Sequence, residues 1–271
     1  MSRAFPIGRL CGIRLDVHAS WFPIYALMAV TIANTAPIAA LGAAGAYAVG
    51  AVAALVLFAS VVAHEIAHAL TARRFGVRTT SIALCLFGGV ATLEAEPPAP
   101  LADAAVALAG PAMSAAVALI AFAALHAVDA VVPVRYADAA ASILAYVTFA
   151  NAVLAGFNLI PAYPMDGGRM LRALLWQLRG ERDGATATAA LVGMGFGACF
   201  AVGGLVAVAA TRTWQFGWYV VLAGFLMRTS WVQYRALRRA PPVITLRPKL
   251  PTPPASEVAS GGVRTADRWS G

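Results

Sequence analysis

Charged residues are scarce in this sequence. Only 12% of its 271 residues are Asp, Glu, Lys or Arg, whereas 61% are hydrophobic. Soluble domains usually carry about 25% charged residues. Because so few charges cannot cover a water-facing surface, the composition excludes an ordinary soluble domain and indicates a protein embedded in a lipid bilayer.

Cysteine is also rare, and its spacing excludes two classes of site. The three cysteines are far apart, at Cys11, Cys85 and Cys199, and no Cys-x-x-Cys pair occurs. The sequence therefore predicts neither a cysteine zinc site nor a disulfide framework. No short apolar run with a cleavage site occurs in residues 1–18, so we expect no signal peptide.

Long apolar runs predict about six membrane-spanning helices, since a helix needs about 20 apolar residues to cross the bilayer. The expected spans are residues 19–38, 43–72, 102–128, 139–161, 185–210 and 214–230. The sixth is the shortest run, because only the 14 residues 214–227 precede Arg228. It spans only if arginine side chains snorkel to the surface, and it could instead be re-entrant.

The net charge of +8 fits this arrangement rather than nucleic-acid binding. The basic residues lie between the apolar runs and near the chain end, not on a face interleaved with aromatic residues. Arg135 and Arg212 fall on one side of a six-span bundle, and the other 18 of the 20 Lys and Arg (20 − 2) fall on the opposite side. This asymmetry predicts that both termini are cytoplasmic. The preponderance of Arg suggests a bacterium and hence its inner membrane.

Two segments are not expected to form membrane-spanning helices. Residues 77–96 alternate in the manner of strands, and Gly88-Gly89 is expected to form the turn of a β-hairpin. Residues 240–271 are rich in Pro, Ser, Thr and Gly and are predicted to be disordered. The expected fold is an all-α polytopic membrane protein over 19–239, with a small cytoplasm-facing hairpin, after a cytoplasmic segment 1–18.

The motif His64-Glu65-Ile66-Ala67-His68 carries the chemistry. Positions i and i+4 of a helix share one face, so both imidazoles can bind one zinc ion. Glu65 lies about 100° around the helix from His64, where it can take a proton from the attacking water. The sequence contains only four histidines, and these two lie in a run that has no other charge. An accidental polar cluster is therefore a poor explanation.

A catalytic zinc site needs a third protein ligand, and Asp166 is the best candidate. The fourth run crosses in the same direction as the second, so Asp166 follows it at the same face as the histidines. The surrounding sequence, Asn158-Leu-Ile-Pro-Ala-Tyr-Pro-Met-Asp-Gly-Gly-Arg169, denies a regular helix, and broken backbone at membrane depth usually lines a site. His18 and His126 lie at the wrong places along the chain.

Together these motifs resemble those of the site-2 protease family of intramembrane zinc metalloproteases. The resemblance rests on His64–His68, Gly88-Gly89, Ala109-Gly110-Pro111 and the segment from Asn158 to Arg169. It implies one zinc ion bound by two His and one Asp, with Glu65 as the base. It also implies that Asn158 lies near the scissile carbonyl, and that the substrates are single-span membrane proteins. Members with cystathionine-β-synthase or PDZ domains are common, but we expect neither domain in these residues.

Two other functions fit parts of the pattern. A metal-binding transporter also has intramembrane ionisable groups and broken helices, but no internal repeat or second polar path is evident here. An inactive relative that only binds membrane proteins would not need Glu65. The sequence names no substrate and no oligomeric state.

Overall fold

The computed structural model describes residues 4–35, 42–85 and 88–239. Its helices are α1 (Trp21–Thr35), α2 (Gly42–Arg74), α3 (Pro100–Val131), α4 (Val134–Asn158), α5 (Asp166–Arg179), α6 (Arg182–Thr211) and α7 (Gly217–Arg239), with a short 3-10 turn η2 (Trp214–Phe216) before α7. Four strands accompany them: β1 (Ala4–Leu10), β2 (Ile13–His18), β3 (Thr79–Cys85) and β4 (Gly88–Leu93). The predicted disordered segment 240–271 lies outside the described residues.

Four helices of the described chain, α2, α3, α4 and α6, are long and apolar enough to cross a membrane. They correspond to the second to fifth expected spans and confirm the predicted class of a helical membrane protein. The first expected span corresponds to α1, which is apolar but has only 15 residues. The sixth corresponds to α7, which has 23 residues and is long enough, but it is not among the helices that are also apolar enough to span a membrane.

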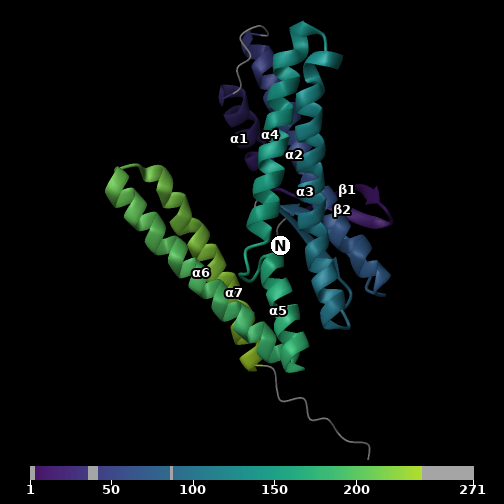
Figure 1. Cartoon of the computed structure of the whole chain (residues 1–271), viewed down its shortest axis with the longest axis vertical. Helices are drawn as coiled ribbons and strands as arrows, with labels where there is room; N and C mark the ends of the chain where they lie inside the picture. The colour runs from purple at the N-terminus through teal and green to yellow at the C-terminus, as the bar shows by residue number, and fades with distance from the viewer. Residues whose placement is uncertain (1–3, 36–41, 86–87, 240–271) are drawn as a thin grey trace, which may run out of the picture. The chain divides into compact units, whose positions relative to one another are not determined.

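Small residues let the spanning helices approach one another closely. Helices α2, α3 and α4 run side by side (Figure 1). Ala53, Ala54 and Ala107 are fully buried between helices, whereas Ile120 and Phe149 are about 70% exposed, at 70% and 68%. Close packing through small residues and an apolar outer surface are typical of helices in lipid.

The strands form one mixed sheet in the order β1-β2-β3-β4, in which β2 and β3 are parallel and the other pairs are antiparallel. The expected hairpin is thus half of a larger sheet. Strands β1 and β2 are not evident from residues 1–18 alone, because β2 pairs with a strand more than 60 residues away. Ile13 and Ile82 anchor the sheet on Ile66 and Ala69 of α2, next to the histidine motif.

The prediction that Gly88-Gly89 forms the hairpin turn is wrong. Both glycines belong to β4, where Gly89 pairs with Leu84 and Gly88 with Cys85. Gly89 does not adopt a positive φ angle. A side chain there would instead collide with Glu65, because an added Cβ would lie 2.9 Å from its Cδ and 3.0 Å from its Oε1. Glycine is present because two elements approach closely, not because the chain turns.

The segment after α4 also differs from the expectation. Residues 159–165 are non-helical as expected, but Asp166, Gly167 and Gly168 form the first turn of α5. A Cβ at Gly167 would overlap the carbonyl oxygens of Leu159 and Ile160, and a Cβ at Gly168 would overlap the backbone of Tyr163. The two glycines therefore pack α5 directly against the preceding loop, which outweighs their low helix propensity.

Candidate metal centre

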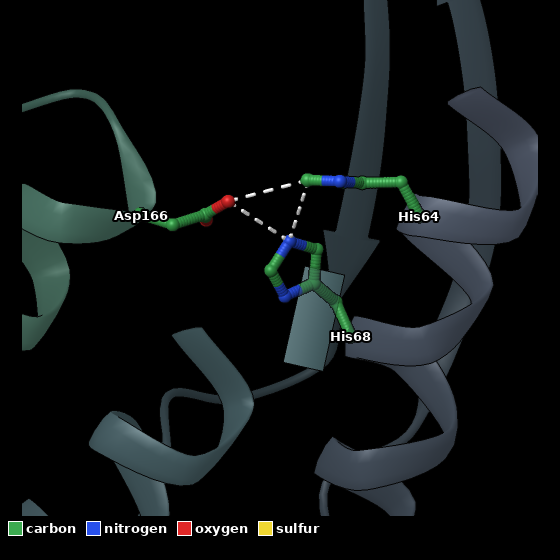
Figure 2. Close-up of side chains that lie close together, drawn as sticks. All are labelled: His64, His68 and Asp166. Carbon is green, nitrogen blue, oxygen red and sulfur yellow. Dashed lines mark hydrogen bonds and ion pairs between the residues drawn. The ribbon is translucent and has the colours of Figure 1, made fainter. Parts of the chain in front are cut away.

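Three buried side chains from two helices converge on one point. His64 and His68 lie one turn apart on α2, and Asp166 is the first residue of α5 (Figure 2). The two Nε2 atoms are 3.1 Å apart, and Oδ2 of Asp166 lies 3.3 Å from Nε2 of His64 and 3.2 Å from Nε2 of His68. All three residues are less than 9% exposed, at 4%, 6% and 8%.

Hydrogen bonds on the far side of each imidazole orient the two rings. Nδ1 of His68 lies 2.6 Å from the carbonyl oxygen of Val106, and Nδ1 of His64 lies 2.9 Å from Oγ of Ser114. A carbonyl oxygen only accepts hydrogen bonds, so Nδ1 of His68 donates and its Nε2 carries a lone pair in the neutral ring. Such outer partners fix the tautomer of metal-binding histidines.

The third side chain supplies negative charge. A free Asp carboxyl has a pKa of about 3.9, well below neutral pH, and a cation bound between His64 and His68 would favour its ionised form further. The carboxylate also lies at the N-terminus of α5, where the helix dipole favours an anion. Asp166 is therefore ionised at neutral pH.

The spacing of these three atoms fits a zinc ion. A tetrahedral zinc with bonds of about 2.0–2.1 Å places its ligand atoms roughly 3.3 Å apart, close to the observed 3.1–3.3 Å. Three acceptor atoms at such distances repel one another unless a cation lies between them. Gly110 of α3 leaves the space, since a Cβ there would overlap Nε2 of both histidines. Two imidazoles and one carboxylate form a donor set that zinc favours.

A cavity of about 400 Å³ adjoins the three residues. Glu65, which follows His64 on α2, lines it and is partly exposed to it. Asn158, the last residue of α4, lines it too, and its Nδ2 donates to the carbonyl oxygen of Leu154 at 2.9 Å. Its other walls come from β4, α3, α7 and the start of α5, among them Gly89, Ala91, Leu93, Val106, Pro164, Met165, Arg169 and Phe225.

Comparison with known proteins assigns the family. The sequence profile of peptidase family M50 matches residues 52–137 and 129–202, which contain the histidine motif, Gly110 and Asp166. The chain belongs to peptidase family M50. This agrees with the resemblance that the motifs indicated.

Relatives of this M50 chain carry matching descriptions. A putative zinc metalloprotease of Synechocystis is 36% identical over 85% of the chain and 59% of the relative. The putative zinc metalloprotease Rip3 of Mycobacterium tuberculosis is 36% identical over 82% of the chain and 58% of the relative. The chain thus spans less than two thirds of these relatives.

A solved structure, the site-2 protease from Methanocaldococcus jannaschii, shares the fold. It aligns with 86% of this chain and 96% of its own, with a TM-score of 0.58 and 24% sequence identity. At this identity the likeness concerns the fold and not the activity.

The structure brings the three predicted ligands together and places Glu65 and Asn158 on the same cavity; the roles of all five residues stay predictions. Sequence reasoning missed the residues that orient the histidines. Gly110 belongs to the motif Ala109-Gly110-Pro111, and Ser114 follows it by one helical turn. Their spacing on α3 was the available signal.

Proposed function

We propose that this M50 chain is an intramembrane zinc metalloprotease that hydrolyses peptide bonds within or beside the transmembrane segments of single-span proteins. The observation that carries the proposal is the buried group of His64, His68 and Asp166 beside Glu65, in a helix of membrane-spanning length. A metal site in a water-soluble protein would not need to lie on an apolar helix of 33 residues.

The chain's own residues divide the work of hydrolysis. His64, His68 and Asp166 would hold zinc, which when bound supplies a Lewis acid for attack on a peptide carbonyl. Glu65 accepts a proton from the attacking water and returns it to the amine that leaves as the C–N bond breaks. Asn158 would donate to the scissile carbonyl with the second N–H of its Nδ2, because the first donates to the carbonyl oxygen of Leu154.

Strand β4 is suited to hold the substrate. A peptide bond inside a helix is shielded, so the substrate has to unwind before cleavage. β4 is the last strand in the sheet order, and its residues Gly89, Ala91 and Leu93 line the cavity. An extended peptide could pair with such an edge through backbone hydrogen bonds, which do not depend on side-chain identity.

The same proposal covers the membrane placement. We infer a bacterial inner membrane with both termini in the cytoplasm, as the distribution of Lys and Arg predicts. The contacts of α6 and α7 support an even number of crossings: Gly204 lies against Tyr219, whereas Gly193 lies against Ser230. α7 therefore returns antiparallel to α6. Ser230 donates at 2.6 Å to the carbonyl oxygen of Tyr163, which precedes Asp166 by three residues.

A trapping experiment tests the function. Glu65→Gln protein would be purified from native membranes, and single-span proteins retained with it would be identified. Each candidate would then be reconstituted in liposomes with wild-type protein, and the new chain ends mapped by mass spectrometry. Cleavage within or next to the transmembrane segment, absent with Glu65→Gln, is expected. Cleavage only in a distant water-exposed loop, or equal cleavage by both proteins, would contradict the proposal.

A further inference from the structure

Helix α3 supplies none of the three proposed ligands, yet it contacts both histidines. The carbonyl oxygen of Val106 accepts from His68, Ser114 contacts His64, and Gly110 leaves room for both Nε2 atoms. Asp103 precedes them on the same helix. These four residues, at positions 103, 106, 110 and 114, follow one another at spacings of three, four and four residues. Such spacings place all four along one face of α3.

Asp103 joins this face of α3 to the helix that carries the third ligand. The guanidinium of Arg172 on α5 donates two hydrogen bonds to the carboxylate of Asp103, from Nε to Oδ2 at 2.9 Å and from Nη2 to Oδ1 at 2.8 Å. Asp103 is fully buried and Arg172 is 5% exposed. Arg169 adds a longer contact, with Nη2 at 3.4 Å from Oδ1 of Asp103.

Such a pair is suited to fixing geometry more than to adding stability. Burying two charges costs about as much as their attraction returns, so apolar replacements of both partners are often tolerated. A planar guanidinium that binds both carboxylate oxygens restrains distance and orientation together. Arg172 lies six residues after Asp166, roughly 9 Å along the helix at 1.5 Å per residue. Fixing Arg172 therefore restrains rotation and sliding of α5, and with it the position of Oδ2 of Asp166.

We propose that Asp103 and Arg172 are positioning residues, which hold Asp166 at the metal centre by clamping α5 to the same face of α3 that orients His64 and His68. In this arrangement one helix sets the geometry of all three ligands. The inference rests on the proposed zinc site but not on the proposed proteolysis, because its test measures metal binding alone.

The test compares zinc affinity in full-length variants. Asp103→Leu/Arg172→Met removes both charges at once, so neither partner of the buried pair is left charged without the other, and the partly exposed Arg169 loses its 3.4 Å contact with Asp103. We expect its zinc affinity, measured by competition with a chelator, to fall about 10–100-fold, as with other outer-shell losses. The visible spectrum of bound Co²⁺ should change as well, because that spectrum reports ligand geometry. The melting temperature of the zinc-free protein should stay near that of the wild type.

Two further variants keep the result interpretable. Arg172→Lys retains the charge but lacks the planar guanidinium that binds both carboxylate oxygens. Its zinc affinity should therefore lie between those of the wild type and the double variant. Arg179→Met is the matched control, because Arg179 lies on the same helix but bonds Thr188 at an exposed position. It should bind zinc as the wild type does.

Wild-type affinity and an unchanged Co²⁺ spectrum in the double variant would overturn the positioning role while leaving the zinc site intact. If the double variant does not fold, Arg172→Lys decides, and wild-type zinc affinity there would overturn the inference. A wild-type protein that binds no zinc would overturn both this inference and the proposed function.

Discussion

Gly110 offers a way to remove the metal without altering any of its proposed ligands. In Gly110→Ala, the new Cβ would lie 2.5 Å from Nε2 of His64 and 2.6 Å from Cε1 of His68, and closer still to Nε2 of His68. Favourable contacts between non-bonded heavy atoms begin at about 3.5 Å. The imidazoles would therefore have to move by roughly 1 Å, whereas metal sites tolerate deviations of about 0.2 Å.

The same substitution should not harm the helix that carries it. Gly110 is an interior residue of α3, where Ala is favoured over Gly by about 0.8–1.0 kcal/mol. We therefore expect zinc affinity to fall by more than about 100-fold, beyond the usual effect of losing an outer hydrogen bond. The zinc-free variant should be within about 2 kcal/mol of the zinc-free wild type, because the gain in helix propensity offsets part of the cost, about 1–3 kcal/mol, of crowding two buried imidazoles.

Thermal unfolding with and without zinc separates the two effects. Zinc at 100 times its dissociation constant should stabilise the wild type by about 2.7 kcal/mol, and the variant by almost nothing. Gly156→Ala is the matched control, because a Cβ at this glycine of α4 meets nothing within 4 Å. If Gly110→Ala bound one zinc per chain with wild-type affinity, the metal could not lie between these histidines.

Three further substitutions test single residues. Glu65→Gln should lower cleavage by about 10²–10⁴-fold and keep the zinc, because Gln cannot accept the proton; metal analysis and a cleavage assay on one preparation check both, and loss of zinc would make Glu65 a ligand. Asp166→Ala should lose both zinc and cleavage, and full metal occupancy would show that the third ligand is another group. Gly89→Ala should keep the zinc but slow cleavage, because its Cβ displaces Glu65; normal turnover would contradict the close approach of β4.

The grouping of the three proposed ligands could be predicted from the sequence. His64 and His68 share a face by helix geometry alone. Asp166 can be predicted as the third ligand because successive spans cross in alternating directions. This brings the ends of the second and fourth runs to the same face of the membrane.

Other features depend on contacts that no local pattern contains. The strand β2 pairs with β3, although α1 and α2 separate the two strands in the sequence. Because glycine favours turns, the sequence pattern predicts a turn at Gly89, whereas in the structure its missing side chain leaves room for Glu65. Asp103 and Arg172 are 69 residues apart, and neither stands out in a list of charged residues.

X-ray absorption at the zinc edge of the purified wild-type protein tests the central claim most directly. The account predicts one zinc per chain, with two imidazole nitrogens and one carboxylate oxygen at about 2.0–2.1 Å, and loss of this signal in His64→Ala/His68→Ala. A sulfur ligand, or an unchanged spectrum in the double variant, would contradict it.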